Sequence, residues 1–239
     1  MSVQKKLLII GASSAIGLET INQLKGEGYQ FLLHYNNHPI KLSELDVRED
    51  QILGVFQGDL STSEGIEYFL ESIPFSVDEI LFCQGIPYYQ LLSETDSSIM
   101  DSLYHIHVKS TMMISKRFLP DMIQQQRGAI IVVSSIWGEV GASNEVVYST
   151  MKGAQISFVK SLAKEVGPSN IKVNAVSPGM IETSMNKVFS VEDVNDWLDT
   201  VPIQRVGYPE DVAKAIRFLL SDRSSYIQGH TLQVNGGKY

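Results

Sequence analysis

The chain has 239 residues, 44% of them hydrophobic, and a formal net charge of −8. This length suits one domain, or at most two, with a substantial core. The acidic balance argues against a nucleic-acid-binding protein, which needs clustered Lys and Arg. Cys83 is the single cysteine, so no internal disulfide can form. No run reaches the roughly 18 apolar residues of a transmembrane helix. We therefore expect a cytoplasmic protein with no membrane partner.

Short apolar runs alternate with amphipathic stretches along the whole chain. The runs predict strands at 6–10, 30–35, 52–57, 79–83, 129–135, 171–177 and 230–235, and the stretches predict helices at 16–26, 62–72, 96–126, 146–166 and 209–220. Continuous Val/Ile/Leu runs are typical of parallel strands covered on both faces. Strand–helix alternation indicates a doubly wound sheet. We predict the α/β class, with residues 1–239 forming a single-domain, Rossmann-type parallel sheet of about seven strands.

The turn after the first predicted strand reads "GASSAIGLET". In doubly wound sheets, ligands bind outside the carboxyl ends of the strands. Gly11 and Gly17 frame this turn, and Ser13 and Ser14 supply hydroxyl donors. Small residues let the backbone approach a pyrophosphate, and the N-terminus of the following helix favours an anion. The turn therefore predicts a dinucleotide site; the alternative is a small-residue turn selected for packing alone.

The end of the second predicted strand, "HYNNHP", bears on the choice of nicotinamide cofactor. An acid there would bind the adenosine ribose 2′-OH and favour NAD, but this stretch has none. Tyr35 and Asn36 offer donors to a 2′-phosphate, although no arginine is present, so NADP(H) is favoured over NAD(H). Asp59, in "QGDLS", is a candidate acceptor for the adenine amino group. Alternatively, Asp59 or Ser61 caps the next helix.

Three polar residues suit the reduction of a carbonyl group. Ser135 follows the fifth predicted strand, and Tyr148 and Lys152 stand four residues apart on a predicted helix, hence on one face. Tyr148 is the candidate general acid, since the carbonyl oxygen needs a proton when hydride reaches the carbon. Ser135 would stabilise the developing charge. The alternatives are a strand-end cap for Ser135 and an interface role for Tyr148.

The lysine gives the phenol a more suitable pKa in this interpretation. An unperturbed phenol has a pKa of about 10. An ammonium at roughly 4 Å, with an effective dielectric constant of about 20, interacts by about 4 kcal/mol. We therefore expect Lys152 to lower the pKa of Tyr148 by roughly two to three units. Lys152 is also a candidate for holding the nicotinamide ribose.

These motifs resemble the classical short-chain dehydrogenases/reductases, and the resemblance runs nearly from end to end. "GASSAIG" is similar to the family's cofactor loop, "SSIWG…YSTMK" to its Ser–Tyr–Lys core, and "SPGMIET" to its segment beside the nicotinamide. Within the family, the carboxyl-terminal part is most similar to 3-oxoacyl-[acyl-carrier-protein] reductases. The resemblance implies catalytic roles for Ser135, Tyr148 and Lys152. The cofactor contacts expected in total are Gly11, Ser13, Ser14, Ile16, Tyr35, Asn36, Asp59, Leu60, Gly85, Tyr148, Lys152, Pro178, Gly179, Ile181 and Thr183.

Three positions depart from the family pattern. Ala15 replaces a loop glycine, which is tolerable where the backbone does not need a positive φ. "FCQG" (82–85) replaces Asn-Asn-Ala-Gly, so that only Gly85 carries over. His107 stands where the family has a catalytic asparagine that holds a water in a proton relay. His107 either holds that water or shuttles the proton, adding pH dependence through a pKa near 6.5, or is a packed helix residue that leaves the relay impaired.

The expected activity is an NADPH-dependent reduction of a 3-oxoacyl thioester or a similar carbonyl. Segment 184–206 is expected to be a substrate lid, since it mixes apolar and charged residues; a docked surface helix is the alternative. The resemblance implies a homodimer or homotetramer and acyl-carrier protein as a candidate partner, with Arg127, Lys164 and Lys172 as candidate basic contacts. Two other functions stay open: a secondary-alcohol dehydrogenase, and a nicotinamide-binding regulator with little turnover.

Overall fold

One parallel sheet organises the molecule. The computed structural model describes residues 4–239, without the side chains of residues 44, 187 and 188. Its strands run in the order β3-β2-β1-β4-β5-β6-β7, and every neighbouring pair is parallel. The strands are β1 (Lys5–Ile10), β2 (Tyr29–Tyr35), β3 (Ile52–Gln57), β4 (Glu79–Phe82), β5 (Gly128–Val133), β6 (Ile171–Pro178) and β7 (Thr231–Val234). The predicted fold class is confirmed, with strand ends within two residues of those expected.

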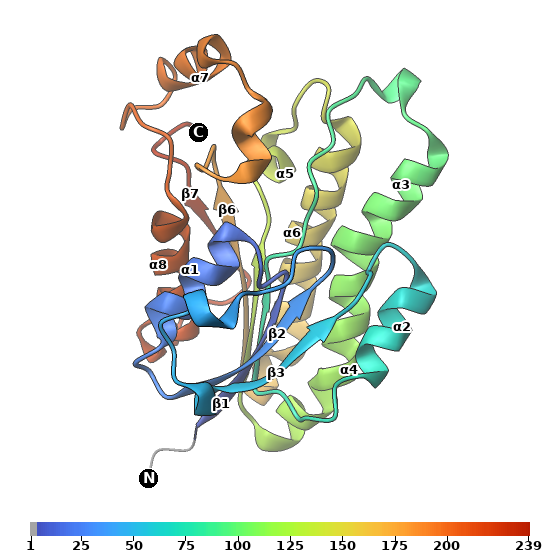
Figure 1. Cartoon of the computed structure of the whole chain (residues 1–239), viewed down its shortest axis with the longest axis vertical. Helices are drawn as coiled ribbons and strands as arrows, with labels where there is room; N and C mark the ends of the chain where they lie inside the picture. Colours follow the sequence, from blue (N-terminus) through green and yellow to red (C-terminus); the bar gives the residue numbers. More distant parts are fainter. Residues whose placement is uncertain (1–3) are drawn as a thin grey trace.

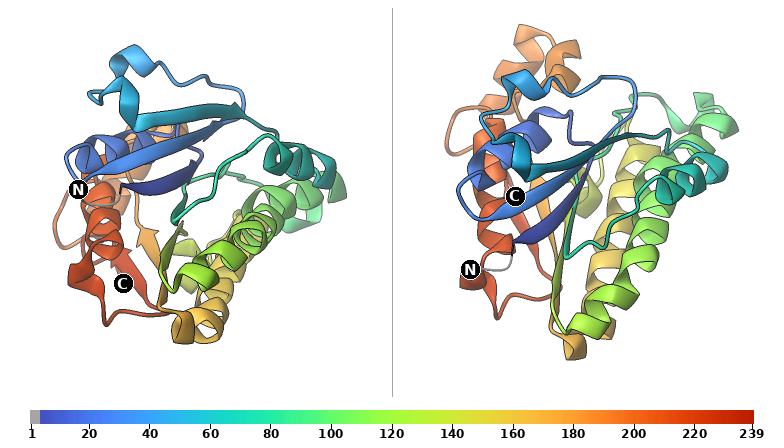
Figure 2. Two further views of the ribbon diagram at one scale, coloured as in Figure 1. Left: turned by 90° about the horizontal axis from the view of Figure 1, so that it is seen from below. Right: turned by 60° about the horizontal axis from the view of Figure 1, so that its bottom comes forward.

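Helices cover both faces of this sheet (Figure 1, Figure 2). On one face lie α1 (Ala15–Leu24) and α8 (Pro209–Leu220), which bury Ile21 and Ile216 against the strands. The other face carries α2 (Ser63–Glu71), α4 (Ser110–Gln125) and α6 (Val146–Val166). The strands are sandwiched between two apolar layers, which explains why their sequences are continuous apolar runs rather than alternating ones.

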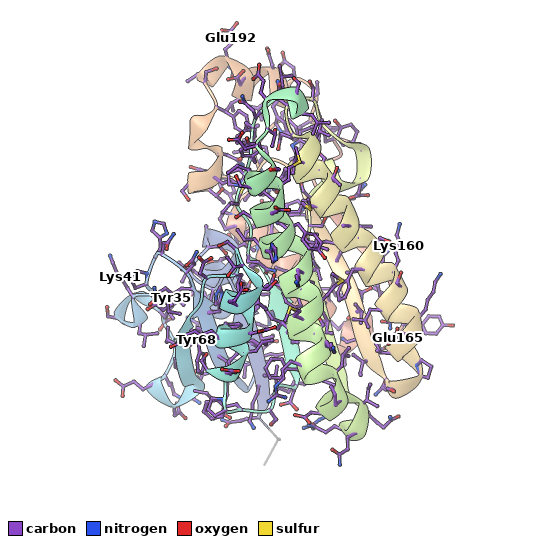
Figure 3. All side chains as sticks on the ribbon, turned by 90° about the vertical axis from the view of Figure 1, so that its right-hand side faces the viewer. Tyr35, Lys41, Tyr68, Lys160, Glu165 and Glu192 are labelled. Atoms are coloured by element: carbon purple, nitrogen blue, oxygen red, sulfur yellow. The ribbon has the colours of Figure 1, made fainter. Side chains whose placement is uncertain are left out.

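The orientation of α6 follows from its two faces. Val159, Leu162 and Val166 are buried against the sheet. Lys160 and Glu165 are exposed, and Figure 3 shows both side chains pointing away from the body of the protein. This division fixes the rotation of α6 about its axis. Its first turns, which carry Tyr148 and Lys152, therefore lie beside the carboxyl end of β5.

The predicted helix 96–126 is not one regular α-helix. It consists of α3 (Ser97–Tyr104), a π-helical turn, η4 (His105–Lys109), and then α4. Two short helices lie outside the predicted elements: α5 (Trp137–Val140), and α7 (Val191–Leu198), which lies in the segment expected to be a lid or a docked surface helix. Short 3₁₀ turns complete the secondary structure: η1 (Leu42–Glu44), η2 (Glu49–Gln51), η3 (Leu92–Glu94), η5 (Gly167–Ser169), η6 (Ser184–Val188) and η7 (Asp222–Ser224).

The winding direction of the sheet reverses at β1. Its neighbours are β2 on one side and β4 on the other, with Ile10 paired to Phe82 at the carboxyl ends. Chain segments leaving β1 and β4 diverge there and open a crevice, which is the usual ligand position in this architecture. Among the described residues, no helix has the length and apolar character needed to cross a membrane.

Candidate active site

A cavity of about 670 Å³ opens at the carboxyl ends of the strands. It brings together most of the residues expected from the sequence: Gly11, Ser13, Ser14, Ile16, Asn36, Leu60, Gly85, Ser135, Tyr148, Lys152, Pro178, Gly179, Ile181 and Thr183. Three expected residues, Tyr35, Asp59 and His107, are not among those lining this cavity. Its wall also includes two residues that the sequence did not single out, His34 and Glu145.

The turn after β1 has the geometry of a phosphate-binding loop. Gly11 has a φ of +74°, and a Cβ there would lie 2.7 Å from the Gln84 backbone nitrogen, so only glycine fits. Ser14 caps α1 by accepting a hydrogen bond from the Gly17 N–H at 3.1 Å. Ala15, which replaces a glycine of the family pattern, is the first residue of α1. Its φ is not positive, so the methyl group is tolerated there. The glycine cradle and the free N–H groups of the helix start fit a dinucleotide pyrophosphate.

His34, the penultimate residue of β2, ties this loop to the neighbouring strand. Its ring is 2% exposed. Nδ1 accepts a hydrogen bond from the Gly11 N–H at 3.1 Å, and Nε2 donates to the Gly58 carbonyl at 3.0 Å. Burial lowers the pKa of His34 to about 4, so the ring is neutral near pH 7. A neutral imidazole is required here, since Nδ1 serves as an acceptor.

The end of the cavity beside the last residues of β2 is polar and has no acid there; we call it the adenosine end, after the group that the sequence predicts at this position. Asn36, Asn37 and His38 line it. Asp59 is exposed, and its carboxylate accepts a hydrogen bond from the Ser61 N–H at 2.9 Å. The alternative role of Asp59 or Ser61 as the helix cap is wrong, because Thr62 caps α2.

Ser135, Tyr148 and Lys152 meet where β5 ends and α6 begins. The Lys152 Nζ lies 5.7 Å from the centre of the Tyr148 ring and donates to the Val133 carbonyl at 3.0 Å. Ser135 and Tyr148 line the same cavity. The Ser135 Oγ also accepts from the Trp137 N–H at 3.2 Å, so it fixes the turn after β5 as well. All three side chains are at least nine-tenths buried.

Burial, rather than the lysine, dominates the electrostatics of the phenol. It raises the pKa of Tyr148 above the usual value of 10, with a further upward contribution from the Glu145 charge and an opposing one from the Ser135 side chain. Burial also lowers the pKa of Lys152 to about 8. The expected lowering of the Tyr148 pKa by Lys152 is therefore not found. The physical reason is that the ammonium is directed at the Val133 carbonyl, inside an apolar wall.

His107 lies in the π-helical turn, with its ring against that of Tyr148. It is fully buried, with Nε2 3.2 Å from the Ile86 carbonyl oxygen. Nδ1 has no hydrogen-bond partner among the described residues. Burial, reinforced by the charge of Lys152, lowers the pKa of His107 well below 6.5. The pH dependence expected from an imidazole titrating near 6.5 is therefore not a property of this site.

Two glutamines that the sequence did not single out hold the π-helical turn. Gln84 follows β4, and its Nε2 donates to the Ile106 carbonyl at 3.3 Å and to Thr111 Oγ1 at 3.1 Å. From α6, Gln155 Nε2 donates to the His107 carbonyl at 2.8 Å. The carbonyls of Ile106 and His107 lie in the π turn, where the regular α-helical backbone hydrogen bonds are interrupted, and the two glutamines donate hydrogen bonds to them. They place His107 directly behind Tyr148.

The substrate end of the cavity is lined by aromatic side chains. Tyr89 meets Phe189 edge to face with centroids 5.5 Å apart, and Trp137 meets Trp197 in the same way at 5.7 Å. The C-terminal residue, Tyr239, also packs on Trp137, at 6.3 Å. Figure 1 shows α7 above the strand ends with the C-terminus beside it. Segment 184–206 thus contributes both apolar and polar residues to the cavity lining: Ser184, Met185, Asn186, Phe189 and Trp197.

The three basic residues expected at the mouth of the site lie elsewhere. Arg127 immediately precedes β5 and pairs with Asp78 at 3.1 Å. Lys172, at the start of β6, donates to the carbonyls that end α8. Lys164 is sixteen residues beyond Tyr148 on α6, about 24 Å along the helix axis. The expectation that these residues flank the active site is wrong, because they sit toward the amino ends of the strands.

Comparisons with known proteins agree with this geometry. The family model described as Enoyl-(Acyl carrier protein) reductase matches residues 11–238. An uncharacterized oxidoreductase of Bacillus subtilis, YmfI, is 43% identical, with 98% of this chain and 99% of that protein covered. The 3-oxoacyl-[acyl-carrier-protein] reductase FabG of Staphylococcus aureus is 32% identical over the full length of both chains.

A solved structure carries the same fold. The 3-oxoacyl-[acyl-carrier protein] reductase of Brucella melitensis superimposes with a TM-score of 0.89 at 24% identity, covering 99% of this chain and 91% of that one. The chain belongs to the short-chain dehydrogenase/reductase family and is an oxidoreductase. Its curated relatives include 3-oxoacyl-[acyl-carrier-protein] reductases.

Proposed function

We propose that this oxidoreductase uses NADPH to reduce the ketone of a 3-oxoacyl thioester or a similar carbonyl compound. The observation that carries the proposal is the convergence of Ser135, Tyr148 and Lys152 on one cavity with the glycine turn of β1. Hydroxyl, phenol and ammonium groups beside a dinucleotide site are the set that carbonyl reduction needs.

Each group has a defined task in this reaction. Bound NADPH supplies hydride to the carbonyl carbon. The Tyr148 O–H donates its proton to the carbonyl oxygen, while the Ser135 hydroxyl donates a hydrogen bond to the same oxygen. Lys152 holds the nicotinamide ribose, and the turn at 11–16 holds the pyrophosphate. The raised pKa of Tyr148 suits this direction, since the phenol stays protonated at neutral pH.

The aromatic lining supports an apolar acyl or ketone substrate. Tyr89, Phe189 and Trp197 present ring faces and edges rather than charges to the substrate end. The 3-oxoacyl class is carried over from the names of the curated relatives. Because the candidate basic contacts lie away from the mouth, a free or coenzyme-linked thioester should serve as well as an acyl-carrier thioester.

The assay follows loss of reduced-nicotinamide absorbance with a short 3-oxoacyl thioester, for the native protein and Tyr148→Phe. Removing the proton donor should reduce kcat by at least about 100-fold, while NADPH binding measured by fluorescence stays near native. Near-native turnover by Tyr148→Phe would contradict the acid role. Cofactor binding without turnover of any carbonyl would favour a regulator, and turnover of secondary alcohols alone would favour a dehydrogenase.

We also propose a cytoplasmic homodimer or homotetramer, as the family resemblance implies. The faces available for assembly are those of α4 and α6, which form the outer layer on one side of the sheet (Figure 3). Light scattering coupled to size-exclusion chromatography distinguishes the two assemblies, and a monomeric mass would contradict both.

A further inference from the structure

Glu145 is a buried carboxyl group that the reaction described above does not use. It is 8% exposed and lines the cavity immediately before α6. Although it occupies the N-cap position, its side chain makes no capping hydrogen bond. No salt bridge to it is found in the part of the chain that the structure describes. A buried acid without a cation or a capping role carries a cost, which points to a role in the site.

The groups around Glu145 come from three elements. Tyr148 stands three residues later, which places it one turn along the same helix face. Tyr89, in the segment after β4, and Trp137, from α5, line the same cavity as Glu145. The carboxyl group thus shares this cavity with two phenols and one indole.

We propose that Glu145 is a positioning residue that sets the pH at which Tyr148 changes from proton donor to proton acceptor. This inference rests on the proposed reductase function. A phenolate forming beside a carboxylate in a shielded cavity meets like-charge repulsion. The carboxylate therefore favours the protonated phenol of Tyr148, the form that reduction requires. It disfavours the phenolate, the form that alcohol oxidation requires, so that the phenolate forms only at higher pH.

The proton balance shows where this matters. In reduction, hydride from NADPH reduces the carbonyl carbon, the Tyr148 O–H bond breaks and its proton passes to the carbonyl oxygen. The phenolate left behind lies next to the Glu145 carboxylate, and the repulsion is relieved when solvent returns a proton. Burial raises the pKa of Glu145 to about 7, so the carboxylate predominates at the alkaline pH where Tyr148 ionises.

The test compares the native protein, Glu145→Gln, Tyr148→Phe and the double variant Glu145→Gln/Tyr148→Phe. Tyrosinate absorbance is followed between pH 8 and 12 in the free protein, with circular dichroism to confirm folding. Subtracting each Tyr148→Phe curve isolates Tyr148, since Tyr89 contributes equally to both members of a pair. We expect Tyr148 to ionise roughly one pH unit lower in Glu145→Gln than in native protein. Superimposable difference curves would overturn the proposal.

Turnover gives the second readout. For alcohol oxidation with NADP⁺, kcat should rise with pH as Tyr148 ionises. In Glu145→Gln this rise should occur at lower pH, by the same roughly one pH unit as the shift in the Tyr148 titration. Glu139→Gln, an exposed acid on α5, is the matched control and should leave the rise unchanged. If Glu145→Gln does not fold, Glu145→Ala removes the same charge and should move both readouts in the same direction.

These readouts separate the two proposals. A shift in the Tyr148 titration accompanied by no turnover of any carbonyl or alcohol refutes the reductase function and leaves the electrostatic coupling intact. Turnover with an unshifted alkaline rise in Glu145→Gln refutes the role of Glu145 and leaves the reductase function intact.

Discussion

The imidazole ring of His107 meets the phenol ring of Tyr148 edge to face, with centroids 5.6 Å apart and planes at 89°. The imidazole is fully buried, and its pKa lies well below 6.5. It therefore acts on the phenol as a neutral packing partner. Such an aromatic pair contributes about 0.5–1.5 kcal/mol beyond the burial of its area.

Replacing His107 with Asn tests whether this residue titrates during turnover. Because the imidazole is neutral throughout, His107→Asn should leave the shape of the kcat profile between pH 6 and 8 unchanged. The amplitude should fall, since loss of the ring contact lets Tyr148 move. The measurement is kcat against pH for both proteins, with His230→Asn, an exposed histidine, as the control. Loss of an inflection near pH 6.5 in His107→Asn would show a titrating role.

Because of His34, we expect the free energy of unfolding to depend on pH in the acid range. Its pKa is lowered to about 4 in the folded protein, against about 6.5 unfolded. The unfolded chain therefore binds the extra proton between these two values, and the free energy of unfolding falls as pH decreases from 6.5 toward 4. The full contribution is about 3 kcal/mol, present above pH 6.5 and lost at pH 4.

Urea unfolding of native protein and His34→Asn at pH 7 and pH 4.5 measures this contribution. Acid should destabilise the native protein by more than it destabilises the variant, and the difference isolates His34 from other titrating groups such as His107. At pH 7 the variant should also be less stable, since the Gly11 N–H loses its acceptor. Equal acid sensitivity in the two proteins would contradict the prediction.

Local sequence patterns predicted the fold and the meeting of Ser135, Tyr148 and Lys152 in one cavity. They did not predict the surroundings of these three residues. Apolar runs predicted the strands because both faces of the sheet are covered. The π turn at 105–109 has no such signature, because residues 96–126 keep a helical spacing. Its carbonyls are held by Gln84, from the segment after β4, and by Gln155, from α6.

The pKa values of the groups in the site could not be predicted from the sequence for a similar reason. The spacing of Tyr148 and Lys152 correctly placed them side by side, but pKa values depend on burial and on the direction of each charge. Glu145 lies in the polar stretch "GASNE", whose composition is typical of an exposed loop. Only the fold, which places this residue in the cavity lining with Tyr89 and Trp137, makes it a buried acid.

At Gly85, the glycine shared with the family pattern, neighbouring side chains lie so close to the backbone that a larger residue would not fit. A Cβ there would lie 2.8 Å from the Cε1 of His107 and 3.5 Å from the Nζ of Lys152. The contact with Lys152 is an ordinary one, but Gly85→Ala should displace the His107 ring, costing about 1–3 kcal/mol of stability and weakening NADPH binding. Gly26→Ala is the control, since a Cβ at Gly26 meets nothing within 4 Å. Thermal unfolding and cofactor titration measure both; unchanged unfolding of Gly85→Ala would contradict the geometry.

Asn36 offers the sharpest test of cofactor preference. It lines the adenosine end of the cavity directly after β2, where an acid would accept the ribose 2′-OH of NADH and repel the 2′-phosphate of NADPH. Asn36→Asp should raise the Kd for NADPH at least about tenfold, or about 1.4 kcal/mol, while the Kd for NADH falls or stays constant. Fluorescence titration measures both constants in free enzyme.

Asn195→Asp, on the exposed surface of α7, is the matched control because it adds the same charge away from the adenosine site. It should leave both dissociation constants within about twofold of native. A native protein that binds NADH more tightly than NADPH would overturn the assignment before any substitution. Parallel weakening of both cofactors by Asn36→Asp would show that Asn36 contacts the shared adenosine rather than the 2′ position. Only the divergence of the two constants supports a 2′-phosphate at the end of β2, because the two cofactors differ at that single group.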